Sequence, residues 1–140
     1  MKFYKCAVCG KIISLQDGSD SIPTICCGQE MKEYLPNTTE GAGEKHLPTY
    51  SFKDKDTLVT SVGAVVHPSM ENHYIKWIML ETDKGNYFRN LKWNDVPVIE
   101  FPLIKGEKPL SIYTLCNIHG LWKAEVGPGK KRCCFLTLCP

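Results

Sequence analysis

Two cysteine pairs in the first part of the chain constrain its fold more than any other feature. The first pair is the Cys-x-x-Cys sequence CAVC at residues 6–9, and the second is the adjacent pair at residues 26–27. A segment this short cannot bury a sufficient hydrophobic core of its own and needs a covalent or metal staple. The N-terminal sequence MKFYKCAVCG lacks the apolar region of a signal peptide. We therefore expect a reducing compartment, in which the cysteines bind metal rather than form disulfides.

The four sulfurs are enough to surround one ion. A tetrahedron around zinc or iron would take one ligand each from Cys6, Cys9, Cys26 and Cys27. Neighbouring side chains normally diverge, so we expect the adjacent pair to distort that tetrahedron. Spacing alone favours a structural zinc ion, and four unligated core cysteines are the alternative without a metal. The pattern indicates a metal site without identifying the metal.

The rest of the chain has the pattern of short strands. We predict strands over residues 57–67 and 73–83, and the sequence DKGN after the second of them is a hairpin turn signal. Further strands are expected over 97–103 and 109–116. With no ten-residue helical periodicity, and with 43% hydrophobic residues to form one core, the pattern favours an antiparallel β-sandwich.

A linker separates the two parts. Residues 35–48 are rich in proline, glycine, threonine and charge, so we predict two domains, 1–36 and 37–140. The net charge of +2 is too small to indicate nucleic-acid binding. No hydrophobic stretch is long enough to cross a bilayer, which favours a soluble cytoplasmic protein.

The second part contains all four histidines of the chain and one cysteine that lies three residues before the last of them. These residues are His46, His67, His73, Cys116 and His119. A lone histidine is more often an ordinary polar or partly buried residue than a ligand. However, a sandwich gathers its loops at its ends, so loops could bring this set together. Five ligands would crowd zinc, and a blue copper site would leave two histidines unused, so the set favours iron with one open position.

The chain resembles desulfoferrodoxin, the two-domain form of superoxide reductase, over nearly its full length. The resemblance rests on the order and combination of YKCAVCG, CCGQEM, GEKHLP, VVHPSMENHYIKWI and CNIHGLWKAEV. It implies an all-β protein with a small desulforedoxin-like domain that carries an Fe(Cys)4 centre, followed by an immunoglobulin-like antiparallel β-sandwich. It therefore implies two iron ions per chain. In the second centre the four histidines would be equatorial and Cys116 axial.

The reaction implied by the resemblance is the one-electron reduction of superoxide to hydrogen peroxide without release of dioxygen. Lys45 would attract the anionic substrate and hold a protonating water, and Glu44 would ligate ferric iron after the product leaves. Without the resemblance, this Glu-Lys pair reads as a solvated charge pair. We also predict that the backbone N–H groups of Ile118 and His119 point at the sulfur of Cys116. The implied electron donor is a rubredoxin-type carrier, and the implied assembly is a homodimer.

Two other functions stay open on the sequence. One is an iron electron-transfer protein whose N-terminal Fe(Cys)4 centre is the functional site. The other is a zinc-ribbon interaction module in which the histidines are scattered. Three further cysteines lie beyond the last matching segment, and ordinary thiols in a terminal strand or tail are the simplest interpretation of Cys133, Cys134 and Cys139.

Overall fold

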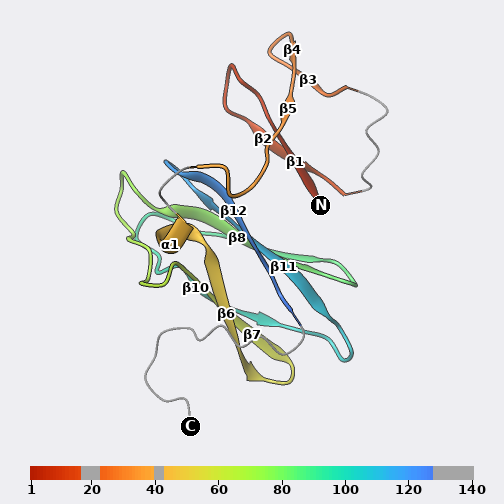
Figure 1. Cartoon of the computed structure of the whole chain (residues 1–140), viewed down its shortest axis with the longest axis vertical. Coiled ribbons are helices and arrows are strands. Elements are labelled where there is room, and N and C mark those ends of the chain that lie inside the picture. The colour runs from red at the N-terminus through yellow and green to blue at the C-terminus, as the bar shows by residue number, and fades with distance from the viewer. Residues whose placement is uncertain (17–22, 40–42, 128–140) are drawn as a thin grey trace. The chain divides into compact units, whose positions relative to one another are not determined.

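The computed structural model of the chain describes three stretches of residues: 1–16, 23–39 and 43–127. The chain divides into two compact units, which we call the first unit (Met1–Leu35) and the second unit (Pro36–Pro140) (Figure 1). Whether each unit is an independent domain, as predicted with a boundary between residues 36 and 37, stays a prediction. Cys133, Cys134 and Cys139 lie outside the described residues.

The first unit is a small β structure with very little core. Its three-stranded sheet has β1 (Lys2–Lys5) between β2 (Ile12–Leu15) and β5 (Lys32–Glu33), and a separate ribbon pairs β3 (Ile25–Cys26) with β4 (Gln29–Glu30). Among its described residues, the fully buried hydrophobic side chains are Phe3, Cys6 and Met31. So small a core agrees with the expectation that a metal staples this unit.

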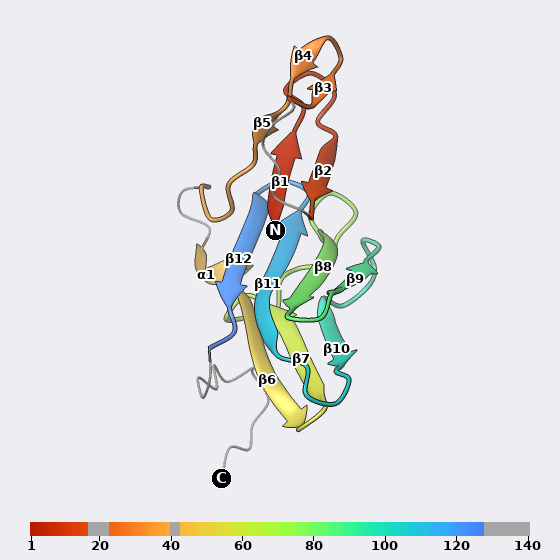
Figure 2. The same ribbon diagram turned by 90° about the vertical axis from the view of Figure 1, so that its right-hand side faces the viewer.

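The second unit is an antiparallel sandwich of two sheets that pack face to face (Figure 2). The three-stranded sheet has the order β10-β7-β6, and the four-stranded sheet has the order β12-β11-β8-β9. The strand bounds are β6 Pro48–Asp54, β7 Thr57–Val62, β8 Ile75–Thr82, β9 Asn86–Asn90, β10 Val98–Pro102, β11 Pro109–Cys116 and β12 Gly120–Glu125. This architecture confirms the predicted all-β fold with a small first unit and a β-sandwich in the second.

A single helical turn, α1 (Gly43–His46), precedes the first strand of the sandwich. Its first turn carries Glu44, and its last residue, His46, is buried. In the part of the chain that the structure describes, no helix is long and apolar enough to cross a membrane.

The inward residues of β11 connect the core of the sandwich with Cys116, one of the predicted metal ligands. Alternate residues of a strand point to the same face, and on β11 this places Ile112, Thr114 and Cys116 on the inward face. Ile112 and Thr114 are fully buried, and Cys116 is 2% exposed. The inward row of β11 therefore ends at the sulfur of Cys116.

The strand predicted over residues 57–67 is shorter than expected, because β7 ends at Val62 and residues 63–66 form a turn. Gly63 has φ +84, and a side chain there would place its Cβ 2.6 Å from the backbone oxygen of Lys45. Only glycine permits this close approach of two backbone segments. The predicted hairpin at DKGN is confirmed by the pairing of β8 with β9.

Glu107 joins three segments at the loop between β10 and β11. One carboxylate oxygen accepts a hydrogen bond from the Thr82 hydroxyl at 2.5 Å. The other accepts hydrogen bonds from the Tyr87 hydroxyl at 2.7 Å and from the Ile104 backbone N–H at 2.9 Å. Burial raises the pKa of Glu107, but these hydrogen bonds outweigh it, so the pKa lies below its ordinary value.

We expect Glu107→Gln to lower the free energy of unfolding of the second unit by about 1–2 kcal/mol at neutral pH. A carboxyl whose pKa is lower in the folded state stabilises the fold above its unfolded pKa, and this contribution is lost as the pH falls through the folded pKa. The difference between variant and wild type should therefore shrink below about pH 4. Urea unfolding followed by tryptophan fluorescence measures it, because all three tryptophans lie in the second unit.

Glu100→Gln is the matched control. Glu100 forms an ion pair with Lys53 at 3.0 Å, but the two side chains are 59% and 55% exposed. The change should therefore stay below about 1 kcal/mol. Equal losses in the two variants would contradict the assignment of a stabilising role to Glu107.

Candidate metal centres

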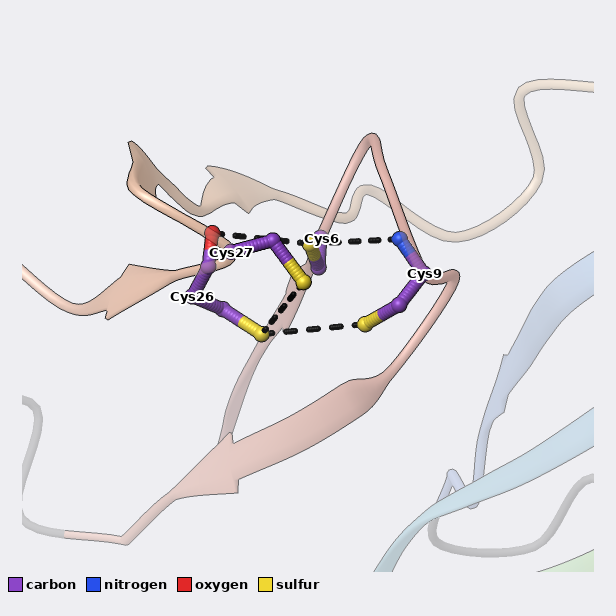
Figure 3. Close-up of side chains that lie close together, drawn as sticks. All are labelled: Cys6, Cys9, Cys26 and Cys27. Atoms are coloured by element: carbon purple, nitrogen blue, oxygen red, sulfur yellow. Dashed lines mark hydrogen bonds between the residues drawn. The ribbon is translucent and has the colours of Figure 1, made fainter.

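The four cysteines of the first unit lie close together with their sulfurs turned toward one another (Figure 3). The ligand atoms all lie within 4.8 Å of one another. The sulfurs of Cys9 and Cys26 are 3.7 Å apart, and those of Cys26 and Cys27 are 3.9 Å apart. A tetrahedral ion with metal–sulfur bonds of about 2.3 Å has sulfurs about 3.8 Å apart, so this cluster fits a tetrahedral metal.

The adjacent cysteine pair contributes to one site because of its backbone conformation. Cys27 has φ +52 and the following Gly28 has φ +74. A non-glycine residue with positive φ is unfavourable, since its Cβ approaches the carbonyl oxygen. The strain of placing neighbouring cysteines on one ion therefore lies in the backbone of Cys27. The predicted distortion of the tetrahedron stays a prediction.

Only a bound cation would keep all four thiols of the first unit ionised at neutral pH. The hydrogen bond from the backbone N–H of Cys9 is the largest reason why the pKa of Cys6 falls to about 6. Burial opposes this fall, and a hydrogen bond from the backbone of Val8 adds to it. Hydrogen bonds with the neighbouring thiols of Cys6 and Cys9 raise the pKa of Cys26 to about 12. Without a cation the four sulfurs cannot all be thiolates at neutral pH, whereas a bound metal would hold them so.

Removal of the metal from the first unit should unfold it locally. We expect Cys9→Ser to abolish the slow amide hydrogen exchange of β1 and β2, because the remaining core is too small to hold this sheet. Exchange in β7 and β11 of the second unit should not change. Hydrogen exchange followed by mass spectrometry measures both, and full protection of β1 in the variant would contradict a stapling role for the metal.

The second cluster gathers four histidines and a cysteine from separate elements of the second unit. His46 ends α1, His67 follows the turn after β7, and His73 lies just before β8. Cys116 ends β11, and His119 lies in the turn before β12. The ligand atoms of the first three histidines and Cys116 lie within 4.8 Å of one another.

The distances show that His119 belongs to the same cluster. The Nε2 atoms of His46 and His67 are 3.0 Å apart, and Nε2 of His73 is 3.2 Å from Nδ1 of His119. The sulfur of Cys116 is 3.7 Å from Nε2 of His67 and 3.7 Å from Nδ1 of His119. The structure thus brings together all five residues that the sequence singled out.

The Nε2 atom of His67 has the protonation that a metal requires. Nδ1 of His67 lies 2.7 Å from the carbonyl oxygen of Pro68, so it donates its proton there and Nε2 presents a lone pair to the cluster. Burial is the largest cause that lowers the pKa of His67 to about 4, which keeps this ring neutral at pH 7. Nε2 of His46 lies 3.0 Å from this lone pair, so either His46 donates a proton to it or a cation binds between the two nitrogens. The donor set therefore fits a metal.

Backbone N–H groups point at the sulfur of Cys116, as predicted. Burial raises the pKa of this thiol above its ordinary value, against the lowering effect of hydrogen bonds from the backbone N–H groups of His119 and Ile118. The sulfur of Cys6 receives the equivalent pair from Cys9 and Val8. Each turn is followed by a glycine with positive φ, Gly10 at +74 and Gly120 at +82. The two clusters are therefore built on the same Cys-x-x-ligand-Gly turn.

Sequence reasoning missed a residue that joins the segments of the second cluster. Asn117 accepts a hydrogen bond from the Tyr74 backbone N–H at 2.9 Å and donates one to the Asn72 carbonyl at 3.1 Å. It thereby fixes the loop that carries His73 against the turn that carries Cys116. Its position between two predicted ligands in CNIHGLW was the available signal.

The predicted charged pair lies beside the second cluster. Glu44 and Lys45 are exposed on α1, directly before His46. Burial and the charge of His119 lower the pKa of His73, and the charge of Lys45 adds to this. The positive charge of Lys45 therefore acts on the cluster, while the catalytic roles of the two residues stay predictions.

Comparison with known proteins shows the family of the chain. The family model "Desulfoferrodoxin" matches residues 38–125. The curated "Desulfoferrodoxin" of Syntrophotalea carbinolica is 39% identical over 125 residues, 89% of this chain and 96% of the relative. The chain belongs to the desulfoferrodoxin family. The "Desulfoferrodoxin" of Nitratidesulfovibrio vulgaris is 41% identical over 125 residues, 89% of this chain and 95% of the relative.

A solved structure supports the desulfoferrodoxin fold of both units. The crystal structure of the superoxide reductase from Treponema pallidum has a TM-score of 0.72 and 27% identity, and the match covers 89% of this chain and 96% of that one. The curated "Superoxide reductase" of Pyrococcus abyssi is 34% identical over 103 residues, 60% of this chain and 87% of the relative. Two proteins similar to this chain are thus named superoxide reductase.

Proposed function

We propose that this protein is a superoxide reductase, which reduces superoxide by one electron to hydrogen peroxide without releasing dioxygen. The observation that carries the proposal is the convergence of four imidazole nitrogens and one thiol sulfur at one end of the sandwich. This donor set belongs to a chain whose relatives include proteins named superoxide reductase. His46, His67, His73, Cys116 and His119 would hold one iron ion, whose bound form supplies the one-electron redox chemistry.

The residues around the cluster have distinct tasks in this proposal. Pro68 fixes the tautomer of His67, so that Nε2 is the donor. The amides of Ile118 and His119 stabilise negative charge on the Cys116 sulfur and so moderate how strongly it donates. The five protein donors would leave one coordination position for a small anion.

Lys45 would act on the substrate, and Glu44 would act after the product leaves. A lysine ammonium on the surface beside the cluster attracts superoxide, and electrostatic focusing of this kind raises encounter rates by roughly ten- to a thousandfold. Lys45 would also hold the water that delivers a proton to the reduced substrate. Glu44 would provide a carboxylate ligand for the ferric ion after the product leaves.

We expect Lys45→Ala to lower the second-order rate constant for superoxide by about three- to tenfold at low ionic strength. The difference should shrink at high salt, because screening weakens the attraction. Lys55→Ala is the matched control. It removes the same charge, but its side chain is 90% exposed and it lies in the turn after β6, the strand that leads away from His46. Stopped-flow mixing with superoxide measures the rates, and equal losses in both variants would contradict local steering.

We infer that the first centre, held by Cys6, Cys9, Cys26 and Cys27, also contains iron. Ferric thiolate centres are coloured, and zinc centres are not, so metal analysis with a visible spectrum decides between them. Cys9→Ser should remove the iron of the first centre and leave superoxide consumption in place. Loss of that activity would instead favour an electron-transfer protein whose functional site is the first centre.

The central experiment compares superoxide consumption with dioxygen release. A reductase supplied with electrons consumes superoxide without releasing dioxygen, whereas a dismutase releases it. We expect Cys116→Ser to lose this activity while the first centre keeps its iron. Dioxygen release by the wild type, or full activity in Cys116→Ser, would contradict the proposed function.

The remaining partners are also proposals. A small rubredoxin-type iron protein would return one electron after each turnover, in the cytoplasm, and two copies of the chain would form a homodimer. Reduction of the ferric protein by such a carrier in a stopped-flow mixture, and sedimentation of the full chain, test these two points.

A further inference from the structure

Trp122 touches two of the five residues of the second cluster. Its indole, on β12, is only 2% exposed. The ring stacks on the imidazole of His46, with centroids 5.3 Å apart and planes 20° from parallel. Its Nε1–H group donates a hydrogen bond to the backbone carbonyl of His119 at 3.2 Å. One side chain therefore contacts a ring from α1 and the backbone of the turn between β11 and β12.

The strand register places Trp122 at this point. Trp122 lies directly opposite Thr114 in the pairing of β11 with β12, and Thr114 is one of the inward residues of β11. The Thr114 hydroxyl donates a hydrogen bond to the backbone carbonyl of His46 at 3.4 Å. This cross-strand pair therefore holds both the ring and the backbone of His46.

His46 needs tertiary support because it ends a very short helix. A helix of four residues has too few internal hydrogen bonds to be stable by itself, so tertiary contacts must fix its last residue. The stacked indole restricts rotation of the imidazole about its side-chain bonds. The hydrogen bond to the His119 carbonyl, together with one from the Thr39 hydroxyl at 2.7 Å, holds the turn whose amides face the Cys116 sulfur.

We propose that Trp122 is a positioning residue for the second metal centre, and that its indole orients the His46 imidazole by stacking and the His119 turn by hydrogen bonding. The proposal rests on the proposed function, since it concerns the same iron. Contacts that orient metal ligands from outside typically contribute 10- to 100-fold in metal affinity. The expected effect of losing them is therefore faster release of the metal and an altered ligand field.

Two variants separate the two contacts of Trp122. Trp122→Phe keeps an aromatic ring over His46 but removes the N–H donor, whereas Trp122→Leu removes both. Trp77→Leu is the matched control, because Trp77 lies on β8 of the same sheet and its ring contacts Phe88, with centroids 5.1 Å apart. Release of ferrous iron to a coloured chelator is followed in each full-length protein, and the electron paramagnetic resonance spectrum is recorded in the ferric form.

We expect release from the second centre to accelerate about tenfold in Trp122→Phe and up to about a hundredfold in Trp122→Leu. The ferric resonance of the second centre should change in both variants. Release from the first centre is an internal control and should not change, and Trp77→Leu should behave as the wild type. A folded Trp122→Leu protein with wild-type release and a wild-type spectrum would overturn the proposal.

Two further outcomes of this experiment also test the proposal. If Trp122→Leu does not fold by circular dichroism, Trp122→Phe decides, and wild-type release from it would overturn the hydrogen-bonding part. If the wild type itself holds no second iron, the proposed function fails separately. The positioning role is then read in metal-free protein, where the indole should shift the His46 ring protons upfield in nuclear magnetic resonance. Equal His46 shifts in the wild type and in Trp122→Leu, which has no ring over His46, would overturn it.

Discussion

Donor atoms held a few ångströms apart are the constraint on which the second unit's candidate site depends. The Nε2 atoms of His46 and His67 face each other at 3.0 Å, and the His67 proton is committed to the Pro68 carbonyl. The Cys116 sulfur lies 3.7 Å from one of these nitrogens. One bound cation satisfies all these donors at once. The end of the sandwich is therefore organised around an ion, in the same way that the first unit is organised around its four sulfurs.

One strand and the turn that follows it place several of these donor atoms. The inward row of β11 ends at Cys116, so the sulfur of Cys116 is a continuation of the hydrophobic core. The turn that follows directs two backbone amides at this sulfur, as the corresponding turn does at Cys6. The same local structure thus serves two donor sets of different chemistry. What distinguishes the centres is which residues the surrounding elements add: a second cysteine pair in one case and three histidines in the other.

Much of this was predictable from the sequence because it depends on spacing and alternation. The cysteine pairs, the histidine set, the hairpin after β8 and the strand Pro109–Cys116 follow from local patterns. The early end of β7 was not predictable, because Gly63 is needed only where the Lys45 backbone approaches it. The contacts of Trp122 and Asn117 were missed for the same reason, since their partners come from distant segments. Residue type alone does not reveal such pairings.

The most direct test of the account is X-ray absorption at the iron edge of Cys9→Ser protein, in which only the second centre should retain iron. The account predicts that each iron, in the ferrous form, has one sulfur neighbour, from Cys116, and four nitrogen neighbours from His46, His67, His73 and His119. Scattering without a sulfur neighbour, or with oxygen neighbours in place of these imidazoles, would contradict it.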